Sequence, residues 1–386
     1  MTPTEIHFGR PWITDEEREA VLRVLSTPIL THGPECKAFE AEFGAAMGSD
    51  AHCVSVSSCM AALHLACLQF GIGPGDEVIL PALTHVAAAH AVEWVGARPV
   101  FVDCTASTGN IDIHQVEQAI TPRTKAISLV HFAGIPCNMP ELMAIAERHH
   151  LRVIEDCAIA IGARFQGKHV GLFGDAGCFS FYPVKHMTTG EGGMFVTRHP
   201  DVANAVQKLR AFGVDRTHQE RSIPGMYDVP SLGLNYRMSE LQAAIGRAQV
   251  GRLATILQRR RQNFEALKHE LRDIQGAAVI DADHPEAQNS HYCLVLLLDE
   301  SRMRERNAIV QRLSAAKIGT SVYYPQPVPR MAYYKNKYGY AREKCLTAER
   351  FSDGSIALPV GQHLTERDMK TIAQAVRTTL KEVQNG

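Results

Sequence analysis

The sequence predicts an α/β fold with a mostly parallel central sheet, followed by a second, smaller domain. Between residues 52 and 157, short β-rich runs alternate with helical segments. This spacing requires right-handed crossovers that place helices on both faces of a parallel sheet. The chain of 386 residues also exceeds the size at which one hydrophobic core stops growing. We therefore expect one large and one smaller domain.

The elements follow in order along the chain. A capping box, Thr14 answered by Glu17, predicts a helix near the N-terminus. Five β-rich runs come next, and they read HCVSVS, EVILPA, PVFVDC, AISLVH and RVIEDC. Two further strands, GCFSFY and GMFVT, precede one long helix predicted from Met238 to Leu267. We expect residues 1–254 to form an N-terminal arm and the large domain, and residues 255–386 to form a small C-terminal domain of mixed α+β pattern.

Composition and charge exclude several classes of protein. The formal net charge of −1 gives no overall field for holding nucleic acid or an anionic membrane surface. The ten cysteines include no Cys-x-x-Cys pair, so neither a zinc site nor a disulfide framework is indicated. The N-terminal residues lack a basic start with an apolar run, and no eighteen apolar residues follow one another. We expect a soluble cytoplasmic protein with no metal, nucleic-acid or membrane partner.

A phosphate-binding turn is predicted where SVSSCMAAL passes from a strand into a helix. Free backbone N–H groups near Ser58 and Cys59, together with the positive end of the helix dipole, favour an anion. Serines also cap ordinary helices, so this turn alone leaves both interpretations open. It contains no GxGxxG and no Walker lysine, which excludes a standard dinucleotide or nucleoside triphosphate loop.

Polar side chains follow two other predicted strands. VIEDC ends an apolar strand with Glu155 and Asp156, and successive strand residues point in opposite directions, so only one of the two can enter a cleft. An aspartate in this place could also simply cap the next helix. His85 in PALTHVAAA follows a strand and offers a flat ring or a general base, although a buried, hydrogen-bonded histidine is the commoner outcome.

Lys185 lies between FYPV and HMTTGEGG, in surroundings that are poor for a solvated charge. Apolar neighbours lower the pKa of a lysine and free its amine as a nucleophile that can form a Schiff base. Ser180, Thr188 and Thr189 supply hydroxyls suited to a phosphate, and three nearby glycines allow close backbone approach. A phosphate cup, a carboxylate and such a lysine describe a pyridoxal phosphate site. The alternative is a surface lysine in a β-hairpin.

Several separated motifs resemble those of the DegT/DnrJ/EryC1/StrS family of sugar aminotransferases, in the order of that family. They are VIEDCAIAIGARFQGKHVGLFGDAGCFSFYPVKHMTTGEGG, SSCMAALHLA, VILPALTHVAAAHAV, GARPVFVDC and LGLNYRMSELQAAIG. The resemblance implies the fold type I architecture of aspartate aminotransferase-like enzymes, with pyridoxal 5′-phosphate as cofactor. It also implies a homodimer whose two active sites lie at the subunit interface.

The resemblance implies a role for five residues. Lys185 matches the Schiff-base lysine, and Asp156 matches the partner of the pyridine nitrogen. His85 occupies the place of the ring that stacks on the cofactor, and Ser180 matches a phosphate ligand. Asn235 in LNYR matches the side chain that reaches the phosphate from the other subunit.

The sequence departs from the family pattern at three places. Ile159 stands where a polar side chain usually lies near the cofactor's phenolic oxygen, so that hydrogen bond is lost or replaced. Met60 replaces the usual threonine of the phosphate loop. The backbone N–H groups of Cys59 and Met60, with the hydroxyl of Ser58 or Ser180, are left to hold the phosphate. The histidine expected after the Tyr-Pro pair is missing, with Val328 nearest to its place.

The resemblance implies amino transfer in two halves. Glutamate aminates the cofactor to pyridoxamine 5′-phosphate, which then aminates a nucleotide-linked keto sugar for surface polysaccharide or glycan biosynthesis. TTGEGG after the lysine resembles enzymes that aminate C4 of a 4-keto-6-deoxy sugar, whereas GALGDGG is more typical of C3 enzymes. The mixed basic and tyrosine segment 330–344 could meet the diphosphate or form a solvated loop.

Three alternatives stay open. A keto-inositol aminotransferase would share every cofactor residue. A cofactor-binding regulator without turnover would share them too. A related sugar dehydratase would have histidine in place of Lys185.

Overall fold

The computed structural model describes residues 5–216, 222–223 and 225–384, and its larger part is built on a seven-stranded sheet. The strand order is β1-β9-β8-β5-β4-β2-β3, with β1 at His52–Val56, β2 at Glu77–Pro81, β3 at Arg98–Val102, β4 at Thr124–Val130, β5 at Arg152–Asp156, β8 at Ala176–Ser180 and β9 at Gly193–Thr197. β3, β2, β4, β5 and β8 pair in parallel, and β9 is antiparallel to both β8 and β1. The predicted mostly parallel sheet is confirmed.

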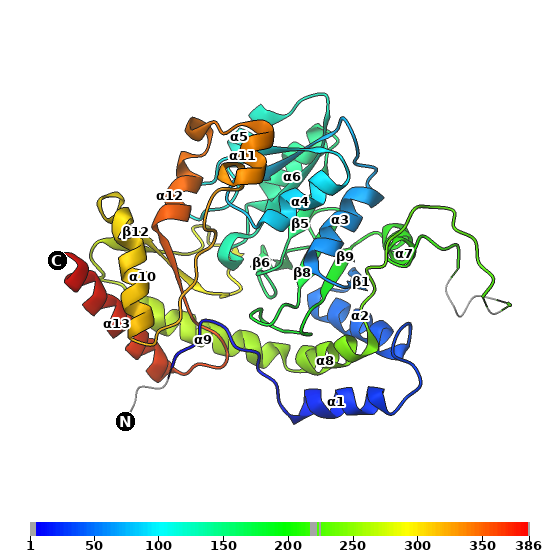
Figure 1. Cartoon of the computed structure of the whole chain (residues 1–386), viewed down its shortest axis with the longest axis horizontal. Coiled ribbons are helices and arrows are strands. Elements are labelled where there is room, and N and C mark those ends of the chain that lie inside the picture. The colour runs from blue at the N-terminus through cyan, green and yellow to red at the C-terminus, as the bar shows by residue number, and fades with distance from the viewer. Residues whose placement is uncertain (1–4, 217–221, 224, 385–386) are drawn as a thin grey trace.

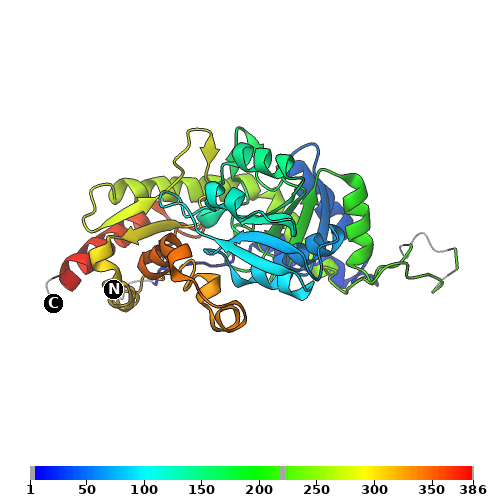
Figure 2. The ribbon, with the colours of Figure 1, turned by 90° about the horizontal axis from the view of Figure 1, so that it is seen from above.

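Helices cover both faces of this sheet (Figure 1 and Figure 2). They are α3 at Cys59–Gln69, α4 at Val86–Trp94, α5 at Ile113–Ala119, α6 at Met139–Arg148 and α7 at Pro200–Leu209. On β2, Val78 and Leu80 pack in one apolar cluster with α3 and α4, while Ile79 packs in another with α5 and α6. Both faces of the strand are buried, which explains why its sequence is a continuous apolar run.

The helix predicted from Met238 to Leu267 is in fact two helices. α8 (Glu240–Gly251) and α9 (Leu253–Glu270) are separated at Arg252, whose backbone leaves the helical region at φ −106° and ψ 4°. The Arg252 guanidinium is held by the buried carboxylate of Glu17, in the first turn of α1 (Asp15–Leu25). Apolar spacing continues across the break, so the sequence pattern does not reveal it.

A second, three-stranded sheet has its own apolar core. Its order is β10-β12-β13, with β10 at Ala277–Ile280, β12 at Leu294–Leu298 and β13 at Ser355–Leu358, and both pairs are antiparallel. The remaining elements are α2 at Pro34–Met47, α10 at Arg306–Ala315, α11 at Ala332–Tyr338, α12 at Leu346–Gly354, α13 at Glu366–Gln384, and the short strands β6 at Arg164–Phe165, β7 at Lys168–His169 and β11 at Ala287–Gln288. None of the helices within the described ranges is long and apolar enough to span a bilayer.

We propose that residues 1–254 and 255–386 are the two domains. The support is a separate cluster around the three-stranded sheet, to which α9, α10 and α13 contribute Phe264, Ile309 and Val376. Figure 1 shows α10 and α13 beside this sheet, away from the helices of the larger one. α9 begins at the proposed boundary and runs from one part to the other.

The N-terminal arm packs on the C-terminal part of the chain. Ile6 belongs to the apolar cluster of the three-stranded sheet. The N–H of Ile6 donates to the Lys317 carbonyl at 2.9 Å, and the N–H of Gly319 donates to the Ile6 carbonyl at 2.7 Å. His363 Nε2 donates to the His7 carbonyl at 3.0 Å. The arm therefore joins the small domain before the chain enters α1.

Candidate active site

Asp156 ends β5 as a buried carboxylate. Its side chain is 2% exposed, and its Oδ1 accepts a hydrogen bond from the Ala158 N–H at 3.0 Å. Burial raises the pKa of the Asp156 carboxyl, while the Ala158 N–H and the positive charges of His85 and Lys185 oppose this effect. A buried carboxylate with so few donors is suited to bind a protonated ring nitrogen.

Glu155 is used to hold the strand in place. Its carboxylate accepts hydrogen bonds from His131 Nε2 at 3.0 Å, and from the N–H groups of Gly171 and Gly174 at 2.7 Å each. Burial alone would raise the pKa of Glu155, but His131 and these N–H donors lower it. Of the two neighbouring carboxylates, only Asp156 is left for a ligand, in agreement with the strand alternation.

Lys185 lies in the turn that joins β8 to β9. The residue is half-buried, and its Nζ lies 5.1 Å from the centroid of the Tyr292 ring. Burial lowers the pKa of the Lys185 ammonium, and the negative charge of Asp156 is the main opposing influence. This shift makes the neutral, nucleophilic form of the amine more accessible than in a solvated lysine. Lys185 does join two antiparallel strands, but it is no solvated surface lysine.

The start of α3 presents free backbone donors. Ser58 is the N-cap residue, and its Oγ accepts a hydrogen bond from the Ala61 N–H at 3.1 Å. Within the described part of the chain, the N–H groups of Cys59 and Met60 have no hydrogen-bond partner. A Cβ atom on Gly193 of β9 would lie 2.5 Å from the Ser58 carbonyl carbon. Only glycine lets β9 approach this turn so closely.

The hydroxyl groups near Lys185 differ in whether their hydrogen is already donated to the protein backbone. Ser180, at the end of β8, is 7% exposed, and its Oγ accepts from the Tyr182 N–H at 3.4 Å, which leaves its own hydrogen available. Thr188 and Thr189 instead donate to backbone carbonyls of the same turn, at 3.0 and 2.7 Å. Each hydroxyl has one hydrogen, so these two threonines shape the turn here, and their part in holding a phosphate stays a prediction.

His85 is the N-cap residue of α4 and is exposed. Its Nδ1 accepts a hydrogen bond from the Ala87 N–H at 3.2 Å, which fixes the ring, and the ring meets Tyr324 edge-on with centroids 6.0 Å apart. Desolvation lowers the pKa of His85, while the charge of Asp156 raises it and that of Lys185 lowers it. A fixed ring beside these two residues can cover one face of a flat ligand.

Ile159 is buried in an apolar cluster that includes Phe132 and Tyr324. Its backbone carbonyl accepts from Ser290 Oγ at 2.8 Å, but its side chain offers no polar atom. Val328 is also fully buried in an apolar cluster, so it does not take over the ligand contacts of the missing histidine.

Two tyrosines that the sequence analysis did not select complete the surroundings of Lys185. The Tyr292 hydroxyl lies 2.8 Å from the Tyr323 hydroxyl, and Tyr292 is the ring next to the Lys185 amine. The Tyr-Tyr pair in VYYP is the only sequence feature that could have drawn attention to Tyr323. The residues around this pair do not indicate that Tyr323 contacts Tyr292, 31 positions earlier.

Within a single chain, the Asn235 side chain does not lie with the other predicted site residues. The residue is exposed, and its backbone bridges to Ala211 beyond the end of α7. The next residue, Tyr236, accepts a hydrogen bond through its carbonyl from the Ser57 N–H at 2.8 Å. The segment thus passes beside the turn that leads into α3, with the Asn235 side chain facing solvent.

The basic residues of segment 330–344 are largely paired with acids of the same chain. Arg330 binds Asp353 at 2.6 Å, and Arg342 binds Glu349 at 2.7 Å. Lys337 pairs with Glu93 on α4. These side chains hold the segment in place, so the interpretation as a diphosphate site loses its main support.

The comparison with known proteins decides the family. The profile of the DegT/DnrJ/EryC1/StrS aminotransferase family matches residues 11–377. The chain belongs to this family. Its fold is the fold type I architecture of pyridoxal phosphate aminotransferases, as expected. Family membership also makes it an enzyme, a sugar aminotransferase, so the alternative of a regulator without turnover is set aside.

Two of the similar relatives are named for nucleotide-linked sugars. The chain is 38% identical over 381 residues to UDP-N-acetyl-3-dehydro-alpha-D-glucosamine 3-aminotransferase of Acidithiobacillus ferrooxidans, covering 98% of this chain and 97% of the relative. It is 35% identical over 380 residues to GDP-perosamine synthase of Caulobacter vibrioides, covering 97% and 98%. The sugar aminotransferase Spr1654 of Streptococcus pneumoniae, solved in its PMP form, has a TM-score of 0.92 at 28% identity, covering 98% of this chain and 100% of that one.

The DegT/DnrJ/EryC1/StrS aminotransferases use pyridoxal 5′-phosphate, and this is the cofactor of the chain. The residues present fit the group. Cys59 and Met60 offer unpaired N–H donors for its phosphate, and Asp156 is a buried carboxylate without a cationic partner in contact. Lys185 offers a partly desolvated amine close to both.

Proposed function

We propose that this aminotransferase moves an amino group from glutamate to C4 of a nucleotide-linked 4-keto-6-deoxy sugar. The observation that carries the reaction type is the Lys185 amine, half-buried beside Asp156 and next to the free N–H groups at the start of α3. The support for C4 is the TTGEGG run after the lysine, which resembles the C4 enzymes of the family.

Each residue has a distinct role in this proposal. When bound, the cofactor supplies an electron sink for a carbanion next to the transferred nitrogen. Asp156 keeps the ring nitrogen protonated, and the N–H groups of Cys59 and Met60, with the Ser58 and Ser180 hydroxyls, hold the phosphate. His85 covers one face of the ring. Ile159 offers only apolar contact near the phenolic oxygen.

Lys185 has a second task once its amine is free. It would take the proton from the α-carbon of glutamate in the first half of the reaction, and it would deliver a proton to the sugar carbon that receives the nitrogen in the second half. The lowered pKa of Lys185 suits this role, because a general base must be unprotonated near neutral pH.

We also propose a homodimer in which Asn235 reaches the phosphate in the partner's site. The support is the exposed position of Asn235 and a row of exposed apolar side chains on the segment before it. These are Ile223, Met226, Val229 and Leu232, the last with 92% of its surface exposed. Figure 2 shows this segment projecting away from the body of the subunit. An uncovered apolar segment of this kind is typical of a protein–protein interface.

A C3 sugar is the second candidate, because the Acidithiobacillus relative is named as a 3-aminotransferase. The test is a panel of ketones presented with glutamate: nucleotide-linked 4-keto and 3-keto sugars, and a keto-inositol. We expect 2-oxoglutarate release with the 4-keto sugar, and NMR should locate the new amine on C4. An amine on C3 would replace the C4 proposal, and turnover of the keto-inositol alone would overturn the sugar assignment.

A further inference from the structure

Arg260 of α9 is a buried arginine next to the aromatic ring that lies beside Lys185. The residue is 3% exposed, and its Nη1 donates to the Tyr292 carbonyl at 2.8 Å and to the His291 carbonyl at 3.4 Å. Its guanidinium carbon lies 5.8 Å from the centroid of the Tyr292 ring. The Lys185 Nζ lies 5.1 Å from the same centroid. Two basic side chains, one from α9 and one from the turn after β8, therefore contact one ring.

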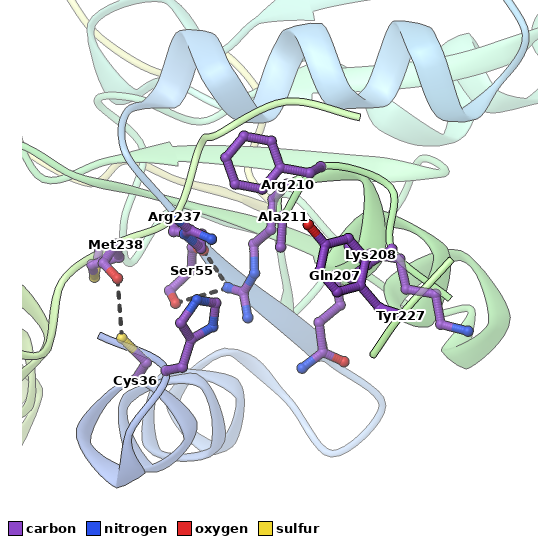
Figure 3. A pocket seen from close by; sticks show the side chains of 12 residues that line it. Cys36, Ser55, Gln207, Lys208, Arg210, Ala211, Tyr227, Arg237 and Met238 are labelled. Atoms are coloured by element: carbon purple, nitrogen blue, oxygen red, sulfur yellow. Dashed lines mark hydrogen bonds between the residues drawn. The ribbon is translucent and has the colours of Figure 1, made fainter. Parts of the chain in front are cut away.

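Among the residues that the structure describes, no carboxylate pairs with the Arg260 guanidinium, and its Nε is buried without a hydrogen-bond partner. Three other arginines with little exposed side chain each have a carboxylate in contact. The pairs are Arg210 with Glu40, Arg252 with Glu17 and Arg302 with Glu305. Figure 3 shows Arg210 beside Ser55, whose hydroxyl it also contacts at 3.0 Å. The charge of Arg260 is instead met by carbonyl oxygens and a ring.

A buried charge of this kind is costly for stability. An ion taken out of water without a counter-ion is unfavourable, and apolar residues of similar volume often replace buried ionic groups without loss of stability. Burial lowers the pKa of Arg260 to about 10, so the guanidinium keeps its proton at neutral pH. Local conflicts of this kind are typical of functional positions. We therefore expect the charge of Arg260 to serve the chemistry of a neighbour.

The polar side chains closest to Arg260 stay uncharged. Burial, together with the charge of Arg260, lowers the pKa of three histidines, that of His291 to about 4; the other two are His186 and His363. Burial raises the pKa of two tyrosines, that of Tyr323 to about 12 and that of Tyr292 further. These groups do not compensate the charge of Arg260.

Lys185 is the neighbour whose protonation matters to the reaction. The ionisable groups around it come from several elements: Cys59 from α3, His85 from α4, Asp156 from β5, Tyr292 and Cys293 from the residues before β12, and Arg260 from α9. Burial lowers the pKa of the Lys185 ammonium, Asp156 opposes this effect, and the charge of Arg260 acts in the same direction as burial. Desolvation lowers the pKa of His85, and burial raises the pKa values of both thiols. One carboxylate and one guanidinium thus act on Lys185 in opposite directions.

The site needs Asp156 and an unprotonated Lys185 at the same time. A carboxylate close to a lysine favours the ammonium form, whereas a nearby positive charge favours the neutral amine. We propose that Arg260 is a positioning residue for Lys185: it holds Tyr292 in place, and its positive charge favours the unprotonated amine. The inference rests on the proposed function, in which this amine is the nucleophile and the proton carrier.

The test measures the pKa of the Lys185 amine in the full-length protein freed of cofactor. Only the unprotonated amine reacts with a trace of acetic anhydride, so labelling at a series of pH values, followed by mass spectrometry of the Lys185 peptide, gives the pH of half-maximal reactivity. Wild type is compared with Arg260→Met and Arg260→Gln, which are neutral, and with Arg260→Lys, which keeps a charge.

The expected shift follows from the distance between the two charges. They lie at most about 11 Å apart across the shared ring, and at an effective dielectric constant of about 20 this corresponds to roughly one pH unit. The half-point of Lys185 should therefore rise by about one pH unit in the two neutral variants and by much less in Arg260→Lys. Arg260→Met keeps the test available if Arg260→Gln does not fold, because an apolar side chain of similar length can fill a buried ionic position.

The matched control is Arg302→Gln, since Arg302 is also buried but binds Glu305 and the Leu380 carbonyl, at 2.7 Å each. This variant should lose stability in urea and leave the half-point of Lys185 unchanged. The inference is overturned if the neutral Arg260 variants keep the wild-type half-point, or if Arg302→Gln shifts it equally. It is also overturned if Arg260→Lys shifts the half-point as far as the neutral variants do, because the charge would then not be the cause. Failure of the proposed function would appear separately, as no release of 2-oxoglutarate by the wild-type enzyme with any of the ketones.

Discussion

The substitution Gly193→Ala tests the predicted phosphate-binding turn at the start of α3, because the added methyl group would clash with its backbone. The added methyl would lie 2.5 Å from the Ser58 carbonyl carbon and 2.6 Å from the Cys59 nitrogen, all of them backbone atoms that have no side-chain freedom. To restore ordinary contact, the start of α3 must retreat from β9 by about 1 Å. A hydrogen bond of normal length from this turn to a phosphate would then exceed the useful range.

The expected loss follows from the donors that move. A hydrogen bond to a charged acceptor is worth about 1.5–3 kcal/mol, so losing the equivalent of one weakens cofactor binding roughly 10- to 150-fold. The assay compares the dissociation constants of pyridoxal 5′-phosphate and of pyridoxal, which lacks the phosphate. The variant should lose affinity for the first and keep most of its affinity for the second.

The matched control is Gly73→Ala, where the nearest atom to the added methyl is 3.9 Å away. This variant should bind both compounds as wild type does. The reasoning is refuted if Gly193→Ala binds pyridoxal 5′-phosphate normally. It is also refuted if affinity for both compounds falls equally, because the damage would then not be specific to the phosphate turn.

Four further predictions follow from the site. Borohydride reduction of the yellow holoenzyme should fix the cofactor on Lys185, and a labelled peptide carrying another lysine would disprove the assignment. Asp156→Asn should still bind cofactor, with a loss of about 1.5–3 kcal/mol, while transamination falls steeply because the ring nitrogen loses its proton; near-normal turnover would contradict the role. Mixing inactive Lys185→Ala with inactive Asn235→Asp protein should restore up to about a quarter of wild-type activity, since half of the exchanged dimers hold one intact site; no recovery after exchange proven by mass spectrometry would argue against a shared site. Glu155→Gln should lower the free energy of urea unfolding at pH 7, and its difference from wild type should shrink as the pH falls below about 4. A carboxylate with a lowered folded-state pKa contributes its full stability above the unfolded pKa and loses it as the pH falls toward the folded pKa; a difference independent of pH would count against the charge of Glu155.

The sheet could be predicted because burial on both faces makes its strands distinctive in sequence. β2 and β4 are apolar throughout, and each is followed by a segment with helical spacing. The break at Arg252 could not be predicted, because the apolar spacing continues from α8 into α9. At the break, the Arg252 guanidinium is held by Glu17, a contact 235 positions away along the chain.

Part of the site could be predicted because the geometry of a strand alone fixes the directions of neighbouring side chains. Asp156 and Glu155 must point to opposite faces, and the structure gives each a separate environment. The hydroxyls of Thr188 and Thr189 could not be assigned from composition, because the same groups serve a ligand or the turn itself. Tyr292 was missed for another reason: its place in the site depends on Lys185, a partner distant in sequence.

The N-terminal arm sets an order of events during synthesis. His7 and His363, which share a hydrogen bond, are 356 positions apart, and a ribosome needs about 20–70 seconds to cover that length. The large domain can collapse during that interval, but the apolar cluster that receives Ile6 cannot be completed until the last helices emerge. Until then, the backbone of Ile6 lacks the partners that it has in the folded structure, the Lys317 carbonyl and the Gly319 N–H.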